Sequence, residues 1–356
     1  MEAVIVAGGL GSRLLPLTEH RPKHLLPVAG IPLVAHQLAK LAAAGITRVV
    51  LATSYHADQF EPVLGDGRDW GLDLVYLREE RPLGTAGAIR NAAGALSSGV
   101  DEPVVVLNGD IVSSHDLGAQ LQHHVAQSAD VTLHLVEVAD PRAYGCVPTQ
   151  PDGRVVAFLE KSPDPVSRQV NAGCYVFSRM TIDSIPPGRV VSVERETFPG
   201  LLLNGRRLVG HLDQAYWRDL GTPAALCEVS SDLVRGIATS AATTRPPGEA
   251  WVGSQASVDR SAIVRGGSAV GAGARVASGA VLEGSLVDEG ATIGAGATVV
   301  DSVVGRGVVI GPDVILRDSV VGDNAEVGQG CELVGGARVW CDVTIPAGGV
   351  RFSSGG

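Results

Sequence analysis

The sequence predicts an α/β protein in which a doubly wound, mostly parallel sheet domain precedes a β-solenoid. Up to about residue 235, short apolar runs alternate with stretches of helical periodicity, which is typical of a parallel sheet covered by helices. From Trp251 onward, aliphatic residues recur every six positions. That period fits neither a helix nor a two-sided strand, but it fits a triangular solenoid with one inward residue per side. We therefore place the first domain at residues 1–238, a linker at 239–250 and the hexad domain at 251–356.

Strands of the first domain are expected at its apolar runs, which are residues 2–7, 48–53, 74–77, 103–110, 131–138 and 155–160. Helical periodicity covers residues 85–96 and residues 33–45, the latter ending at a C-capping glycine, Gly45. In sheets of this kind ligands bind beyond the carboxyl ends of the strands, where Gly8 and Asp110 stand.

The hexad pattern begins at Val252. Its step shortens to five before Val287, Val304 and Val321, so that GSLV, DSVV and DSVV repeat every 17 residues. This regularity predicts about three hexads per coil, with the aliphatic stack as the core.

Composition argues against several classes of protein. The formal net charge of −10 disfavours a nucleic-acid-binding face. No apolar run reaches the roughly 20 residues that span a bilayer, and the N-terminus does not resemble a signal peptide. The five cysteines are scattered, without metal-like spacing, which suits a reducing compartment. We expect a cytoplasmic protein with no nucleic-acid or membrane partner.

The segment VAGGLGSRLLPLTEHRPKHLLP, residues 6–27, carries the strongest chemical signal. Gly8, Gly9 and Gly11 follow a strand, as they do in dinucleotide-binding turns. However, the order is not G-x-G-x-x-G, and prolines at positions 16 and 22 forbid an uninterrupted helix. A purely structural turn is the alternative, but it leaves the cations Arg13 and Lys23 unexplained. A glycine-rich backbone flanked by Arg and Lys indicates a triphosphate-binding loop.

This segment resembles the signature of the sugar-1-phosphate nucleotidyltransferases, G-G-x-G-[ST]-R-L-x-P-L-T-x-x-x-P-K-x-L-L-P, and the resemblance extends over nearly the whole chain. It implies a Rossmann-like domain of the GT-A type followed by a left-handed β-helix. It also implies that the glycines and Arg13 hold the nucleotide phosphates and that Lys23 contacts phosphate oxygens near the reacting centre. The implied reaction is in-line attack of a sugar 1-phosphate on the α-phosphorus of a nucleoside triphosphate, with pyrophosphate as the leaving group.

Other family motifs occur in the same order along the chain. LNGD and WRDLGTP place Asp110 and Asp219 where the family holds Mg²⁺, an ion that prefers a few carboxylates together with substrate phosphates. The resemblance assigns the sugar phosphate to residues of AYGC, LEKS and VNAGCY, which are Gly145, Glu160, Lys161, Asn171 and Gly173. Lys40, the third of only three lysines, is expected to be a solvated surface residue.

The stretch EERPLGTAG resembles the base-binding turn of the guanylyltransferase branch. In it Gly84 and Gly87 would let the base approach the backbone beside Thr85. Glu79 is the candidate base reader, because a carboxylate only accepts hydrogen bonds and guanine presents the adjacent donors N1–H and N2–H₂. The alternative is a solvated acidic pair, Glu79 and Glu80, that caps the next helix.

Several readings of function stay open. The favoured activity is guanylyl transfer to mannose 1-phosphate. Glucose 1-phosphate adenylyl or thymidylyl transfer, guanylyl transfer to a valienol-type cyclitol 1-phosphate and a non-catalytic regulatory homologue are alternatives. Acyl transfer by the solenoid is disfavoured because the chain has no histidine after His211. The regular sides of the solenoid suit subunit packing, so we expect a homo-oligomer.

Overall fold

The computed structural model describes residues 1–159 and 163–351. These residues form two compact units that do not follow chain order. The first unit comprises Met1–Gly9 and Val34–Trp217, and the second comprises Leu10–Leu33 and Arg218–Gly356. Most of the signature segment therefore groups with the hexads, although sequence alone assigned it to the first domain.

The first unit is built on a seven-stranded sheet with the order β10-β8-β9-β6-β1-β4-β5. Its strands are β1 (Glu2–Ala7), β4 (Arg48–Thr53), β5 (Asp73–Arg78), β6 (Pro103–Asn108), β8 (Val131–Glu137), β9 (Gln169–Ser178) and β10 (Leu208–Leu212). Strand pairing is parallel except around β9, which runs antiparallel to β6 and β8. The doubly wound, mostly parallel sheet is thus confirmed.

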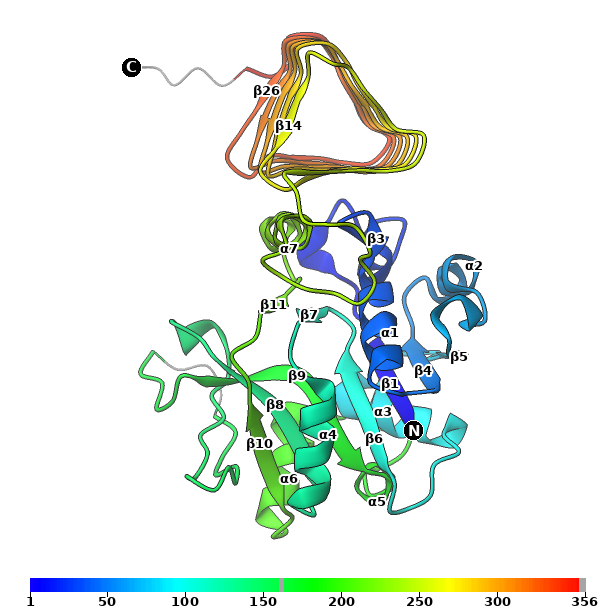
Figure 1. The fold of residues 1–356 in the computed structure, drawn as a ribbon, viewed down its shortest axis with the longest axis vertical. Coiled ribbons are helices and arrows are strands. Elements are labelled where there is room, and N and C mark those ends of the chain that lie inside the picture. The colour runs from blue at the N-terminus through cyan, green and yellow to red at the C-terminus, as the bar shows by residue number, and fades with distance from the viewer. Residues whose placement is uncertain (160–162, 352–356) are drawn as a thin grey trace. The chain divides into compact units, whose positions relative to one another are not determined.

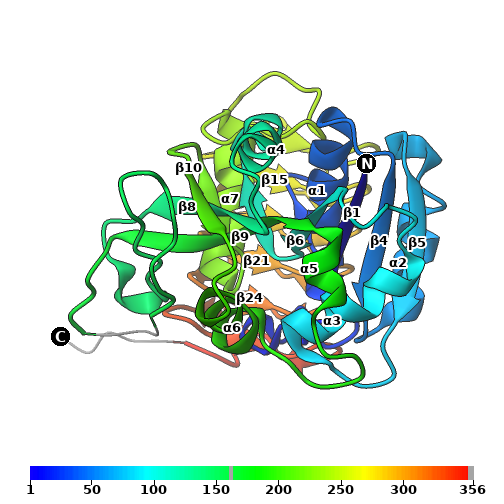
Figure 2. The same ribbon diagram turned by 90° about the horizontal axis from the view of Figure 1, so that it is seen from below.

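Helices cover both faces of this sheet. Figure 2 shows α1 (Leu33–Ala43) and α4 (Leu117–Ala126) over one face, and α3 (Gly84–Ala92), α5 (Arg179–Asp183) and α6 (Phe198–Leu203) over the other. The short α2 (Phe60–Leu64) precedes β5. The helix expected over 33–45 is confirmed, and Gly45 follows it with a φ of +80°.

The strand expected at residues 155–160 is wrong. Val155 and Leu159 form only isolated bridges, to Thr149 and Cys146. Val155 is buried against the sheet core, so its apolar character reflects packing and not a ladder. The strand that pairs in the sheet is instead β9, which has ten residues. It was not predicted because it contains a glycine and an asparagine, which are uncommon in strands.

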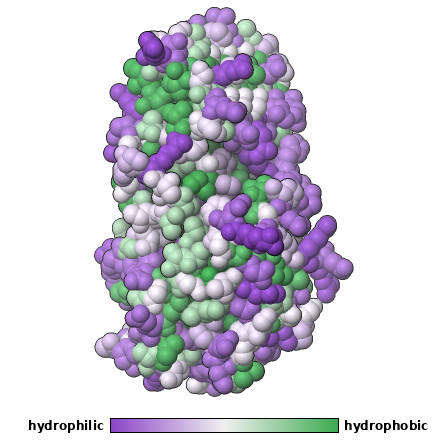
Figure 3. Space-filling view, turned by 45° about the vertical axis from the view of Figure 1, so that its right-hand side comes forward, coloured by the Kyte–Doolittle hydropathy of each residue, from purple (hydrophilic) through white to green (hydrophobic). Residues whose placement is uncertain are grey.

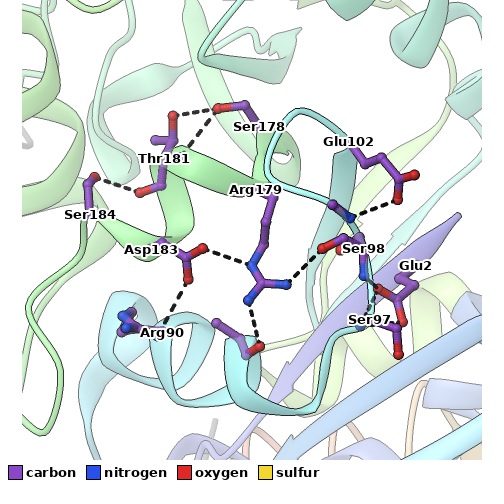
Figure 4. Close-up of polar contacts among 12 residues, drawn as sticks. Glu2, Arg90, Ser97, Ser98, Glu102, Ser178, Arg179, Thr181, Asp183 and Ser184 are labelled. Carbon is purple, nitrogen blue, oxygen red and sulfur yellow. Dashed lines mark hydrogen bonds and ion pairs between the residues drawn. The ribbon is translucent and has the colours of Figure 1, made fainter.

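A polar network anchors the end of α3 away from its glycine-rich start (Figure 4). The Arg179 guanidinium donates to the carbonyls of Ala93 and Ser98, both at 3.1 Å. Its Nε donates to Asp183 at 3.1 Å. Arg90 of α3 lies 3.7 Å from the other oxygen of Asp183, so α3 and α5 are joined through one carboxylate.

In the second unit the hexads form the expected left-handed β-helix, whose coils are triangular in cross-section (Figure 1). Three parallel sheets make its sides, with the orders β12-β15-β18-β21-β24-β27, β13-β16-β19-β22-β25-β28 and β14-β17-β20-β23-β26. The strands are β12 (Ala250–Val252), β13 (Ser257–Val258), β14 (Ile263–Arg265), β15 (Ser268–Val270), β16 (Arg275–Val276), β17 (Val281–Glu283), β18 (Leu286–Val287), β19 (Thr292–Ile293), β20 (Thr298–Val300), β21 (Val303–Val304), β22 (Val309–Ile310), β23 (Ile315–Arg317), β24 (Val320–Val321), β25 (Glu326–Val327), β26 (Glu332–Leu333), β27 (Arg338–Val339) and β28 (Thr344–Ile345). The unit also holds the hairpin β2 (Pro27–Val28) and β3 (Ile31–Pro32), and α7 (Pro223–Arg235).

The aliphatic hexad positions form a buried stack inside the β-helix, as expected. A ladder of serines accompanies the shortened steps of five. The Ser285 amide donates to Ser268 Oγ at 3.1 Å, and Ser302 and Ser319 continue the ladder at 3.2 and 3.1 Å. Each of these hydroxyls accepts the amide of the next coil, which would otherwise be buried without an acceptor.

No helix among the described residues is both long and apolar enough to cross a lipid bilayer.

Candidate functional site

The signature segment starts in the first unit, where β1 ends and the chain turns at Gly8. A Cβ atom placed on Gly8 would lie 3.0 Å from Ser54 Oγ and 3.7 Å from Glu79 Oε2. Ser54 Oγ donates to the Gly8 carbonyl at 2.7 Å, which fixes the turn. Gly9 follows and is exposed. The predicted phosphate loop and the predicted base reader are therefore neighbours.

Glu79 is buried, with 7% of its surface exposed, whereas Glu80 beside it is exposed. Its Oε2 accepts the amide of Leu83, the N-cap residue of α3, at 3.4 Å. Its Oε1 is buried and has no hydrogen-bond partner among the described residues. Burial raises the pKa of this carboxyl, and the Leu83 amide opposes the shift. Because Glu79 is buried, the solvated-pair alternative is wrong for it, and its bond to the Leu83 amide does not cap the first turn of α3.

The glycines of PLGTAG are required by packing within the protein, because neighbouring backbone leaves no space for a side chain. A Cβ atom on Gly84, whose φ is +72°, would lie 2.6 Å from the Val191 carbonyl oxygen. One on Gly87 would lie 2.7 Å from the Arg189 carbonyl oxygen. Thr85 Oγ1 accepts the Val193 amide at 2.8 Å. Segment 189–193 therefore occupies the space that these glycines leave, and their contact with a base stays a prediction.

Asp110 is separated from the end of β6 by Gly109 and directly precedes the short strand β7 (Ile111–Ser113). Gln37 of α1 holds this turn, because its Nε2 donates to the carbonyls of Asn108 at 2.8 Å and Ile111 at 2.9 Å. Both acceptors flank Asp110. Gln37 itself is buried, so the turn is attached to the interior and not to a mobile surface group. The motif analysis missed Gln37, which resembled an ordinary helical residue.

Lys40, one helical turn from Gln37, is not the solvated surface residue that we expected. Its Nζ donates to the carbonyls of Ser113 at 2.9 Å and His115 at 2.7 Å. Nζ also lies 3.0 Å from His115 Nδ1. Burial lowers the pKa of Lys40 to about 8. The lysine thus secures the segment that follows Asp110.

Next to Lys40 lies a buried pair of imidazole rings. The rings of His115 and His134 stack with their centroids 3.7 Å apart. Gln120 Oε1 lies 3.0 Å from His115 Nε2, whereas neither ring nitrogen of His134 has a hydrogen-bond partner among the described residues. Burial lowers the pKa of His134 to about 3 and lowers that of His115 further. Both rings are neutral at physiological pH.

The predicted sugar-binding residues of β9 join a polar network. Asn171 Nδ2 donates to Tyr175 Oη at 2.8 Å and to Glu194 Oε1 at 2.7 Å. Its Oδ1 accepts the Gly173 amide at 3.1 Å. A Cβ atom on Gly173, whose φ is +75°, would lie 3.0 Å from Asn108 Nδ2, so the network reaches the turn that carries Asp110. Tyr175, the last residue of VNAGCY, and Glu194 were not singled out in the sequence.

Gly145 lies against the strand-like segment that leads to LEKS. A Cβ atom on Gly145 would lie 3.0 Å from the Leu159 carbonyl oxygen, and the Cys146 amide donates to that oxygen at 2.9 Å. Glu160 and Lys161 come next and lie outside the described residues, so their predicted contacts with the sugar phosphate stay predictions.

The second unit holds the rest of the signature. Gly11 has a φ of +64°, and a Cβ atom there would lie 3.1 Å from Lys23 Cβ. Thr18 Oγ1 donates to the Gly11 carbonyl at 2.9 Å, which closes the loop on itself. Lys23 begins a 3₁₀ turn, Lys23–Leu25, after Pro22. The loop therefore brings Gly11 and Lys23 together although 12 positions separate them in the sequence.

Arg13 lies against the WRDLGTP motif of the same unit. A Cβ atom on Gly221 would lie 2.9 Å from Arg13 Cζ and 3.3 Å from Asp219 Oδ1. The cation and the carboxylate therefore flank a glycine. After Gly221, Thr222 caps α7 by accepting the Ala225 amide at 3.2 Å, and Pro223 occupies its first turn. We did not single out Gly221 in the sequence, and only its packing shows why a side chain is excluded there.

The nucleotidyl transferase family model matches residues 2–236, and the GMPPB C-terminal domain model matches residues 247–346. The chain is 51% identical over 355 residues to the mannose-1-phosphate guanylyltransferase of Mycobacterium tuberculosis, covering 99% of this chain and 98% of that one.

More distant relatives match a shorter part of the chain. The catalytic subunit beta of the Drosophila melanogaster mannose-1-phosphate guanylyltransferase is 35% identical over 222 residues, or 62% of this chain and 59% of its own. The crystal structure of HddC from Yersinia pseudotuberculosis complexed with GMP-PN superimposes with a TM-score of 0.56 at 26% identity. It covers 65% of this chain and 98% of that one. The chain belongs to the nucleotidyl transferase family, in the form that carries a GMPPB-type C-terminal domain.

Proposed function

We propose that this protein transfers the guanylyl group of GTP to mannose 1-phosphate, which yields GDP-mannose and pyrophosphate. The relative that matches along its whole length bears the name of this activity, and the solved HddC complex contains a guanine nucleotide analogue. The observation that carries the choice of base is the buried Glu79 carboxylate beside the glycine turn, because one of its oxygens has no hydrogen-bond partner in the described part of the chain.

Burying a carboxylate oxygen without a donor is costly, so a ligand that supplies donors gains from this site. Guanine supplies two adjacent donors on its Watson–Crick edge. Adenine, uracil and thymine each present an acceptor within the corresponding edge, which a carboxylate repels. Guanine binding would also favour the ionised form of Glu79, against the effect of burial.

The sugar phosphate needs no strong general base, because the second pKa of a phosphate monoester is near 6. Its oxygen attacks the α-phosphorus, a new P–O bond forms and the bond to pyrophosphate breaks in line. We propose that Arg13, Lys23 and Lys161 neutralise the charge that develops on the phosphates. Asn171, Gly173, Gly145 and Glu160 are proposed to orient the sugar.

Family members generally depend on a divalent metal ion. The carboxylates of Asp110 and Asp219 suit Mg²⁺, which takes a few protein oxygens and completes its shell with phosphate oxygens and water. When bound, the ion supplies charge neutralisation at the phosphates. The chain's own contribution is to hold Asp110 in a turn fixed by Gln37 and to place Asp219 beside Gly221.

The test is a pyrophosphate-release assay with Mg²⁺, five nucleoside triphosphates and the 1-phosphates of mannose, glucose and a valienol-type cyclitol. We expect GTP with mannose 1-phosphate to be the best pair. Glu79→Gln should lower kcat/KM for GTP about 10- to 100-fold, the loss expected for a charged hydrogen-bond partner. Glu80→Gln is the matched control, because Glu80 is exposed. An unchanged base preference in Glu79→Gln would remove Glu79 from base reading, and no pyrophosphate with any pair would favour a regulatory homologue.

We also propose that the protein is a homo-oligomer located in the cytoplasm. Exposed large hydrophobic residues of the β-helix, Ile263, Val309, Trp340 and Val343, support packing between subunits. Figure 3 shows hydrophobic areas among hydrophilic ones on one face of the molecule. Light scattering on the full chain measures the oligomeric state, and a monomeric mass would contradict the proposal.

A further inference from the structure

The signature loop is attached to the β-helix within the second unit. Arg338 Nη1 of β27 donates to the Leu15 carbonyl at 2.5 Å. Cys341 Sγ lies 3.4 Å from the Pro16 carbonyl oxygen, at hydrogen-bond distance for a thiol donor. These contacts hold the part of the loop that lies between Arg13 and Lys23.

The centre of this attachment is a buried arginine. Arg21 has 4% of its surface exposed. Its Nη2 lies 2.5 Å from Asp288 Oδ2 and 3.1 Å from Asp323 Oδ1. Both carboxylates belong to the β-helix and are themselves buried. Asp323 Oδ1 also accepts the Arg306 amide at 2.9 Å, so it is held in place independently of Arg21.

The β-helix leaves space for this ion pair because one coil has a glycine at the position that Asp288 occupies in the coil before it. Asp288 stands directly after the inward Val287, and Gly305 occupies the corresponding position one coil later. A Cβ atom on Gly305 would lie 2.6 Å from Asp323 Oδ1, so a side chain there would displace the carboxylate. The two carboxylates thus come from coils that are separated by one coil with a glycine.

This arrangement is not explained by packing of the β-helix alone. Two buried carboxylates and a buried guanidinium are costly unless they are paired, and an apolar contact of similar size would stabilise at least as well. What an ion pair adds is register, because a charged group cannot slide to a neighbouring apolar position without losing its partner. The buried pair therefore defines where residue 21 lies along the β-helix.

Position 21 matters because Lys23 is two residues further along. Pro22 between them has a φ of −67° and leads directly into the turn Lys23–Leu25. Lys23 in turn packs on Gly11, where a Cβ atom would lie 3.1 Å from Lys23 Cβ. A displacement of Arg21 is therefore transmitted to the cation and to the glycine loop.

We infer that Arg21 is a positioning residue for nucleotidyl transfer. Through Asp288 and Asp323, the β-helix would hold the phosphate-binding loop in the position that the reaction needs. This inference rests on the proposed role of Lys23 at the phosphates. It assigns the β-helix a task in the reaction in addition to any task in assembly.

The experiment compares the full-length protein with the double variant Asp288→Asn/Asp323→Asn. We expect kcat for pyrophosphate release to fall at least tenfold, while KM for mannose 1-phosphate changes less than twofold. Hydrogen exchange of the amides in residues 10–26 should accelerate, with exchange inside the β-helix unchanged. The matched control is Asp301→Asn/Asp318→Asn, which removes two exposed carboxylates of the same β-helix at positive φ, where asparagine is tolerated.

An equal kcat in the folded double variant, or an equal loss in the control, would overturn the inference. Because the double variant leaves Arg21 buried without a carboxylate, a triple variant that adds Arg21→Leu removes the charge altogether. A persistent kcat loss in a triple variant with wild-type thermal stability supports positioning, and full recovery of kcat contradicts it. The proposed function is judged separately, from pyrophosphate release by the unmodified protein.

Discussion

The guanidinium of Arg13 lies directly against the backbone of Gly221, so that a Cβ atom at position 221 would lie 2.9 Å from Arg13 Cζ and still closer to Nη2. The two residues are 208 positions apart, and Asp219 flanks the same glycine. A side chain at this glycine would therefore act on the phosphate-binding loop.

Gly221→Ala should displace Arg13 and lower kcat by about 10²-fold, the loss typical when one charge-stabilising group leaves its place. The backbone of Gly221 is outside the positive-φ region, so alanine adds no conformational strain. The measurement is steady-state pyrophosphate release, with Gly200→Ala as the control because a Cβ atom there meets open space. Wild-type kcat in Gly221→Ala would show that Arg13 can move without consequence.

Lys23→Ala should lower kcat about 10²- to 10³-fold, because the ammonium is proposed to neutralise charge that develops as pyrophosphate leaves. KM for mannose 1-phosphate should change little, since the resemblance assigns the sugar to other residues, among them Asn171 and Gly173. Steady-state kinetics with GTP and mannose 1-phosphate separates the two parameters. A raised KM with unchanged kcat would assign Lys23 to substrate binding alone.

Gln37→Leu should raise the Mg²⁺ concentration for half-maximal activity by about 10- to 100-fold, the range found when a group that orients a metal ligand is removed. The reason is that Gln37 Nε2 holds both carbonyls that flank Asp110. A Mg²⁺ titration of pyrophosphate release measures the effect. Gln122→Leu is the control on α4, where the side chain is exposed, and an equal shift in that variant would argue against a role for the turn.

His134→Phe should reduce the loss in the free energy of unfolding that occurs as the pH falls below about 6.5. The folded pKa of His134 is about 3, against an ordinary value near 6.5, so between these values the unfolded chain binds the extra proton. Stability of the natural protein therefore falls as the pH drops from 6.5 toward 3. At pH 4 this group contributes up to about 3 kcal/mol of that loss, which phenylalanine would remove.

The measurement for His134→Phe is urea unfolding followed by circular dichroism from pH 4 to pH 7. His56→Phe serves as the control, because that ring is only half-buried and makes only a tilted contact with the Tyr55 ring. Parallel pH profiles for the natural protein and His134→Phe would contradict the assignment.

The architecture could be predicted from the sequence because it depends on periodicity. Alternating strand and helix patterns specified the parallel sheet, and the six-residue repeat specified the β-helix, whose coils have 17 or 18 residues. The prediction of a strand at residues 155–160 was wrong because an apolar sequence does not by itself show that a segment pairs in a sheet. Val155 packs in a loop, and β9 forms the strand. The signature and its cations were recognisable because phosphate chemistry restricts which residues can serve.

Tertiary structure alone decided which groups are neighbours. Lys40 seemed a surface residue in the sequence, and only the fold places it among carbonyls beyond Asp110. The hexad pattern did not predict that Asp288 and Asp323 would pair with Arg21. Hexad periodicity specifies the inward aliphatic positions but not which residues pack on the outside of the coil. The sequence by itself determined the fold class, the family and the chemical groups available for the reaction. The tertiary structure decided their pairing, because burial and charge depend on residues hundreds of positions away.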